Sequence, residues 1–154
     1  MTCTNLISIR IERRRLAVAV FSGLRLEYHD VRELPTDSHK ARVATRRFVS
    51  WIVATFPPEA VAVETVTARE GTRRTELAHI VGGTLMLLRT PRIHVSSPEV
   101  LGGFAAPALR TKKELRAVGA ALWPELAARH VHPSTFDAAT LGLHVQMRSL
   151  FHNP

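Results

Sequence analysis

The stretch NLISIRIERRRLAVAVFSGLRLEYHDVREL, residues 5–34, decides the fold of this chain. It predicts strands at residues 5–11, 16–21 and 24–31, because β-branched residues are dense in the first two and apolar and polar residues alternate in the third. Ser22-Gly23 supplies a tight turn, so we expect an antiparallel meander. The alternation in the third strand is typical of a half-buried strand at or near a sheet edge.

Beyond residue 34 the hydrophobic period becomes helical, and strands and helices then alternate. Apolar spacing and breakers predict a helix from about residues 36–38 to Pro57-Pro58, a buried strand at 61–65, a helix at 73–89 and a strand at 92–96. Capping boxes at residues 111–114 and 134–137 predict two further helices, the last ending near Phe151.

This order of elements predicts an α/β fold with a mixed five-stranded sheet. Three antiparallel strands are followed by two parallel ones, and helices flank the sheet. We expect residues 1–154 to form a single domain, because this length fits one domain of modal size. A right-handed crossover places the fourth strand beside the first, which puts Arg10 next to Glu64.

The composition indicates a globular protein with a polyanionic partner. Hydrophobic residues make up 45% and charged residues 22%, which excludes a disordered or collagen-like chain. The formal net charge is +8, and all but three of the basic residues are arginine, which suits phosphate contacts. A coding bias toward arginine, with a solvated basic surface and no partner, is the alternative explanation.

Cysteine content and hydropathy bear on the compartment. Cys3 is the only cysteine, so an internal disulfide or a cysteine-based zinc site is excluded and a reducing compartment is expected. No apolar run approaches the roughly 20 residues that span a bilayer. We therefore expect a cytoplasmic protein without a membrane segment.

Three stretches of the chain, in their order and spacing, resemble the RuvC-type Holliday-junction resolvases of the ribonuclease H-like superfamily. Residues 6–21 are similar to the family's first hairpin, residues 62–66 to the strand that carries its second acid, and residues 137–143 to its final acidic helix. The resemblance extends from about residue 5 to residue 150 and implies a ribonuclease H-like fold. In these enzymes, acids on the first strand, the fourth strand and the last helix bind two Mg²⁺ ions, which need hard oxygen ligands.

The chain departs from this metal-binding pattern. Aligned without a gap, Arg10 takes the place of the first-strand aspartate, and Ser134 stands where the family has histidine or aspartate. The resemblance leaves Glu64 and Asp137 as remnant catalytic and metal-binding residues. Because a guanidinium does not lose its proton at usable pH, Arg10 opposes metal binding.

Each remaining acid also has a structural interpretation. Glu64 is expected to neutralise Arg10 across the two central strands. Asp137 is also the acid of the Ser134 capping box, which is favourable at the positive end of a helix. A second register, with Asp137 at the earlier family position and Thr140 at the later one, fits the apolar spacing less well.

Other candidates carry weaker signals. Glu12 is expected to be solvated because it opens a run of arginines, although it lies on the same strand face as Arg10 and could act as a substitute carboxylate. His130 and His132 have no fixed convergence for a metal, and Glu70 is expected to be solvated. Gly82-Gly83 lacks the residues of a phosphate loop and is better explained by close helix packing, for example at a dimer interface.

The resemblance also implies that basic residues of three loops flank the site. These are Arg13, Arg14 and Arg15; Arg69, Arg73 and Arg74; and Arg110, Lys112 and Lys113. Phosphate contacts from such loops would be sensitive to salt and largely independent of sequence. The family's stacking aromatic after the second acid is absent, with Val66 and Thr67 in its place.

Three functions follow as hypotheses. The leading one is a nucleic-acid-binding pseudo-nuclease that has lost two-metal chemistry, with DNA as its partner, no cofactor and a homodimeric state. The second is an active Mg²⁺-dependent, structure-selective endonuclease that uses Glu64, Asp137 and a rearranged Glu12. The third is a non-catalytic assembly subunit whose basic surface binds protein.

Overall fold

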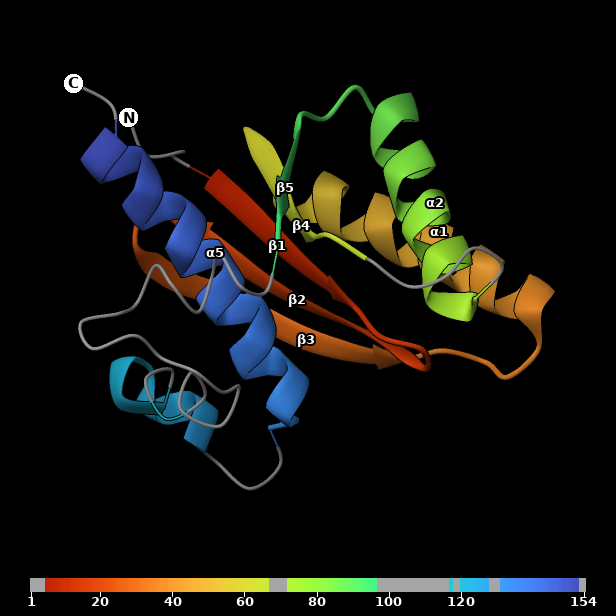
Figure 1. Ribbon diagram of the computed structural model, residues 1–154, viewed down its shortest axis with the longest axis horizontal. Helices are drawn as coiled ribbons and strands as arrows, with labels where there is room; N and C mark the ends of the chain where they lie inside the picture. The colour runs from red at the N-terminus through yellow and green to blue at the C-terminus, as the bar shows by residue number, and fades with distance from the viewer. Residues whose placement is uncertain (1–4, 67–71, 97–116, 118–119, 128–130, 153–154) are drawn as a thin grey trace.

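Five strands form one mixed sheet that carries helices on both faces (Figure 1). The computed structural model describes residues 5–66, 72–96, 117, 120–127 and 131–152. The strands, in the order β3-β2-β1-β4-β5 across the sheet, are β1 (Asn5–Ile11), β2 (Arg15–Ser22), β3 (Arg25–Glu33), β4 (Ala60–Glu64) and β5 (Arg92–Val95).

The strand directions confirm the predicted meander and crossover. β1 and β3 are antiparallel to β2, while β4 is parallel to both β1 and β5. β3 is longer than predicted because its ladder with β2 continues to the pair Arg15 and Glu33. β1 therefore lies at the centre of the sheet with β4 beside it, as the sequence predicts.

Three long helices and one short 3-10 turn, Pro124–Ala127, accompany the sheet, and residues 120–122 are also helical. The helices are α1 (Ser38–Thr55), α2 (Arg73–Leu87) and α5 (Pro133–His152). Asp37 caps α1 by accepting a hydrogen bond from the backbone N–H of Lys40. α2 ends two residues before the predicted limit, because Arg89 adopts a left-handed φ of 55° that cannot continue a helix.

The helices bury the two faces of the sheet separately. Ile7, Ile9 and Ile11 of β1 pack in the cluster that includes α1 and α2, whereas the cluster on the other face includes α5. A Cβ on Gly142 of α5 would lie 3.0 Å from Ser8 Oγ and would clash with the ring of Phe21. The glycine therefore allows α5 to lie close to the face of the sheet onto which Ser8 projects.

The capping box at residues 111–114 lies outside the described residues, but residues 117 and 120–122, which follow it, are helical, as the prediction of a helix there requires. None of the described helices is long and apolar enough to cross a bilayer.

Candidate functional site

The candidate site is centred on Arg10, at the carboxyl end of the central strand β1. Residues two apart in a strand share a face, so Ser8, Arg10 and Glu12 project toward the same side. Ser8 Oγ donates a hydrogen bond to the carbonyl of Ala138, which identifies this as the α5 side. The side chain of Arg10 is only 10% exposed, so its charge requires partners within the protein.

Three carboxylates surround the guanidinium of Arg10. Glu64, the last residue of β4, accepts a hydrogen bond from Arg10 Nη1, which confirms the predicted ion pair. Asp137 Oδ2 of α5 and Glu12 Oε1 each lie 3.3 Å from Arg10 Nε. The side chains of Glu64 and Asp137 are 8% and 4% exposed. We call these four residues the Arg10 cluster; they join β1, β4 and α5.

The charges within the Arg10 cluster keep its cation protonated. Burial alone would lower the pKa of Arg10, but the negative charges of Glu64, then Asp137 and Glu12, outweigh burial and raise that pKa above its ordinary value. The guanidinium is therefore a permanent internal cation.

Glu12 belongs to the cluster, so the expectation that it is solvated is wrong. Its Oε1 accepts a hydrogen bond of 2.6 Å from Ser134 Oγ, and its Oε2 lies 3.4 Å from Arg15 Nη1. Burial would raise the pKa of Glu12, but the hydrogen bond from Ser134 and the charges of Arg10 and Arg15 lower it overall. The period-2 spacing from Arg10 was the sequence signal for this position, and the run of arginines masked it.

The start of α5 corrects the predicted capping box. The helix begins at Pro133, a favourable first position for proline, so Ser134 lies inside the helix. His132 precedes the helix, and its Nδ1 lies 3.0 Å from the backbone nitrogen of Ser134. Ser134 itself donates to Glu12, and Asp137 faces Arg10.

Thr140 would take the later family position in the second register at the start of α5. The buried hydroxyl of Thr140 donates to the carbonyl of Phe136, at 2.8 Å, within its own helix. Asp137, which occupies a family position in either register, forms an ion pair with Arg10.

His132 connects the cluster to the first hairpin. Its Nε2 lies 2.8 Å from Arg15 Nη1. A neutral imidazole has one acceptor nitrogen and arginine only donates, so His132 accepts either from Arg15 or from the backbone of Ser134, not from both. This contact was not predicted, although Pro133 at the first helical position marks His132 as the residue before the helix. His130 lies outside the described residues.

The described residues do not fit a resident metal ion. Among them, no three histidine, cysteine, aspartate or glutamate side chains are arranged to hold one. The physical reason is Arg10, whose guanidinium lies between Glu64, Asp137 and Glu12. A cation about 4 Å from a divalent ion costs roughly 8 kcal/mol at an effective dielectric constant of 20.

The predicted basic residues divide into exposed and engaged groups. Arg13 and Arg14 are exposed between β1 and β2, whereas Arg15 pairs with Glu12 and Glu33. Arg73 donates to the carbonyls of Pro35 and Thr36, and Arg74 Nε donates to the carbonyl of Ile11 at 2.9 Å. Arg73 and Arg74 thus connect α2 to the segment before α1 and to the end of β1. Arg69, Glu70, Arg110, Lys112 and Lys113 lie outside the described residues.

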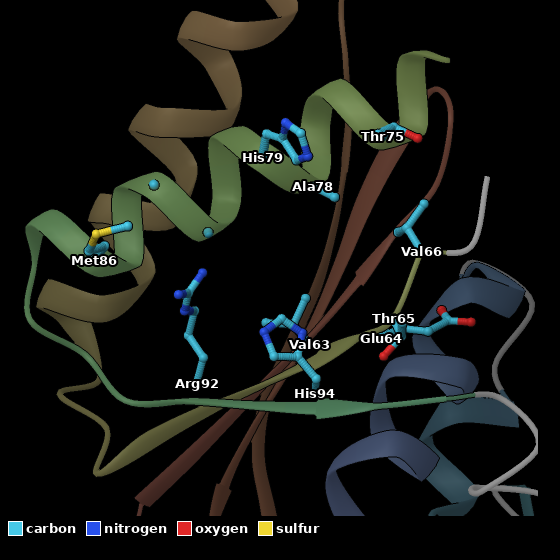
Figure 2. Close-up of a pocket in the computed structure, with 12 residues that line it drawn as sticks. Val63, Glu64, Thr65, Val66, Thr75, Ala78, His79, Met86, Arg92 and His94 are labelled. Carbon is cyan, nitrogen blue, oxygen red and sulfur yellow. The ribbon is translucent and has the colours of Figure 1, made fainter. Parts of the chain in front are cut away.

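A cavity of about 400 Å³ lies between α2 and β5, with Glu64 and Val66 at one end and Arg92 toward the other (Figure 2). A Cβ on Gly82 would lie 2.7 Å from Arg92 Nη1, so this glycine makes room for the arginine of β5. A Cβ on Gly83 would meet no atom within 4 Å. Close packing therefore accounts for the glycine at position 82 but not for the one at position 83. The residue packed against Gly82 is Arg92 of a strand, not a residue of another helix as predicted. Thr67, next to Val66, lies outside the described residues.

Comparison with known proteins identifies the fold. Neither a protein-family model nor a curated protein sequence matches the chain. RuvC of Thermus thermophilus, solved in complex with a Holliday junction substrate, is similar in structure with a TM-score of 0.77 at 18% identity, over 96% of this chain and 95% of that one. A yeast mitochondrial Holliday junction resolvase is similar with a TM-score of 0.67 at 12% identity, over 96% of this chain and 80% of that one. The Holliday junction resolvase of fowlpox virus is similar with a TM-score of 0.63 at 12% identity, over 93% and 98%.

The sheet order, the helices on both faces and these structures define a ribonuclease H-like fold. Within that class, the fold of this chain is that of the RuvC-type resolvases, as its sequence predicts.

Proposed function

We propose that this chain is a nucleic-acid-binding protein with a RuvC-like fold that lacks two-metal nuclease activity. The observation that carries the proposal is the Arg10 cluster, in which a guanidinium on β1 is bound by Glu12, Glu64 and Asp137. The cation that compensates these carboxylates is part of the chain itself.

The contacts of the cluster oppose a catalytic role for its acids. Glu64 and Asp137 direct oxygens at Arg10 rather than at a shared vacant position. Ser134, where the resemblance would place another ligand, donates its hydroxyl to Glu12. The remnant acids are therefore best explained as partners of Arg10, and no resident cofactor is proposed.

Binding of nucleic acid, with DNA as the favoured form, is supported by charge and fold. The chain carries a formal net charge of +8, and Arg13 and Arg14 are exposed at the end of β1 that carries the cluster. The Thermus RuvC and the fowlpox virus resolvase have both been solved with Holliday junction DNA. Phosphate contacts from the hairpin fit this charge distribution.

The test measures binding and cleavage separately. Wild type should bind duplex and branched DNA at low salt, and the double substitution Arg13→Ala, Arg14→Ala should reduce the log–log salt slope by up to about one unit per residue that contacts phosphate. Arg25→Ala, an exposed arginine at the other end of the sheet, is the matched control. The same protein should not cleave these substrates with Mg²⁺ or Mn²⁺. Metal-dependent cleavage abolished by Glu64→Gln would refute the loss of activity.

An active Mg²⁺-dependent endonuclease is the second candidate, and one observation favours it. Glu12 does lie with Glu64 and Asp137 around one point, as a substitute carboxylate would. This candidate requires Arg10 to leave the cluster when metal and DNA bind. If cleavage occurs, Glu12→Gln should abolish it as fully as Glu64→Gln does.

The remaining parts of the proposal concern assembly and location. A homodimer is supported by Met86 and Leu87, which α2 leaves 65% and 87% exposed. A cytoplasmic location is supported by the single cysteine, and one domain over residues 1–154 by the chain length. Light scattering on the purified protein tests the dimer. A basic surface that binds no nucleic acid would favour an assembly subunit instead.

A further inference from the structure

An aromatic cluster lies between β3 and α1, on the face of the sheet opposite the Arg10 cluster. Tyr28 stacks on Phe56 with ring centroids 5.0 Å apart, and Trp51 stacks on Phe48 at 6.1 Å with an interplanar angle of 15°. Phe48 is 7% exposed, but Trp51 is 42% exposed. The cluster therefore leaves part of the Trp51 indole in contact with solvent while the other side of the cluster is buried.

Arg32 of the edge strand β3 lies over this aromatic surface. Its guanidinium carbon is 5.0 Å from the ring centroid of Phe48 and 5.6 Å from that of Trp51. Its Nε donates to Asp30 at 2.8 Å, which helps to hold the side chain in place. A guanidinium and an exposed indole thus stand together in a fixed arrangement.

A groove of about 420 Å³ opens beside these residues, between β3 and α1. Arg32, Arg47 and Trp51 line it, together with Glu33, with Leu34 just after β3, and with Ala44 and Phe48 of α1. Arg47 is exposed and has no ion pair among the residues that the structure describes, whereas Glu33 already accepts from Arg15. The groove therefore combines an aromatic surface with an uncompensated positive charge.

The groove adjoins the basic hairpin of the proposed nucleic-acid surface. Leu34, which also lines the groove, donates its backbone N–H to the carbonyl of Arg14 at 2.7 Å. The exposed Arg13 and Arg14 therefore lie next to one end of the groove. Leu34 and Trp51 line the same groove, so a strand whose phosphates bind at the hairpin enters the groove at the end that holds Leu34.

We propose that this groove, the Trp51 groove, binds an unpaired nucleotide of a nucleic-acid strand, with the base stacked on Trp51 and a phosphate near Arg47. The inference rests on the proposed binding of nucleic acid and identifies single-stranded segments as the form that this surface recognises. Aromatic side chains in a basic groove are the usual means of binding single strands, because every base offers a flat face. Bases within a duplex are already stacked on each other and offer no such face.

The test uses an oligothymidylate of about 16 nucleotides and a duplex of mixed sequence, both at low salt. Trp51→Ala should weaken binding of the single strand roughly 5- to 150-fold and leave duplex binding unchanged. Trp51→Phe should retain most of the affinity because it keeps an aromatic face. Leu24→Ala, at a 49% exposed apolar residue in the turn between β2 and β3, is the matched control and should bind as wild type does.

Fluorescence gives a second measurement on the same proteins. The chain has two tryptophans, and Trp123 is buried with its ring edge-on to Phe21. The bound oligothymidylate should therefore quench the emission of Trp51 in wild type. It should leave the emission of Trp51→Phe unchanged, because Trp123 is the tryptophan that remains in this variant. Equal single-strand affinity of wild type and a folded Trp51→Ala, with duplex binding intact, would overturn the Trp51 groove alone. Failure of wild type to bind either probe would overturn the proposed function as well.

Discussion

Removal of the cation at position 10 is the most direct perturbation of the cluster. Arg10→Ala would leave Glu64 and Asp137, at 8% and 4% exposure, without the guanidinium that binds both. Breaking a buried ion pair by removing one partner costs about 3 to 5 kcal/mol, because the remaining charge stays buried and uncompensated. Here one cation serves three carboxylates, of which Glu12 retains its contacts with Ser134 and Arg15. We therefore expect a loss of about 3 to 5 kcal/mol in the free energy of unfolding.

Chemical unfolding followed by circular dichroism measures this loss, with Arg13→Ala, an exposed arginine of the same hairpin, as the control. A divalent cation adds a second arm. Without the guanidinium, the three carboxylates become a set of hard oxygen donors, so Mn²⁺ should raise the stability of Arg10→Ala and leave wild type unchanged. At a hundredfold excess over its dissociation constant, a ligand specific to the folded state adds about 2.7 kcal/mol.

Two results would refute this reasoning. An unfolding midpoint of Arg10→Ala equal to that of wild type would show that the ion pairs contribute nothing to stability. Equal stabilisation of wild type and variant by Mn²⁺ would show that the guanidinium does not exclude a metal ion from the cluster.

Three further predictions test other parts of the structure. Gly142→Ala should lower the free energy of unfolding by about 1 to 3 kcal/mol, because the added Cβ would crowd Ser8 and Phe21. Gly83→Ala places its Cβ in open space and should stabilise α2 by up to about 1 kcal/mol; thermal unfolding measures both variants. The pKa of Glu12 is lower in the folded state than in the unfolded chain, so Glu12 stabilises the fold above its unfolded pKa, and this stabilisation is lost as the pH falls through its folded pKa. Ser134→Ala removes the hydrogen bond to Glu12 and should therefore weaken the loss of stability at acid pH, measured as the unfolding midpoint against pH. Arg10→Asp should bind Mn²⁺ in a calorimetric titration with at most weak cleavage of DNA, which Ser134→Asp should increase.

The backbone frame and the central ion pair were predictable from the sequence. Alternating residues and a tight turn define the meander, and the handedness of the crossover places Glu64 beside Arg10. The placement of Glu64 beside Arg10 follows from the order of the strands. Two opposite charges buried side by side on central strands are then expected to pair, because a buried charge without a partner is costly.

The rest of the Arg10 cluster depends on tertiary packing that a local pattern does not contain. Asp137 satisfies the spacing of a capping box equally well, and its pairing with Arg10 follows from the close approach of α5 that Gly142 permits. Glu12 precedes a run of arginines, and this pattern predicts a solvent-exposed side chain. In the structure the hydroxyl of Ser134, a residue of α5, donates a hydrogen bond to it. The contacts of Asp137 and of Glu12 were both missed because α5 lies more than a hundred residues from β1 in the chain.

The origin of the charge compensation has a consequence for function. A bound metal ion can dissociate, but a guanidinium carried by β1 remains whenever the strand is folded, so the cluster joins β1, β4 and α5 at any metal concentration. The surfaces proposed to bind nucleic acid, the hairpin at Arg13 and Arg14 and the Trp51 groove, do not include the cluster. Binding by these surfaces therefore requires no metal, and we expect chelators to leave the DNA affinity of wild type unchanged while the same chelators reverse any stabilisation of Arg10→Ala by Mn²⁺.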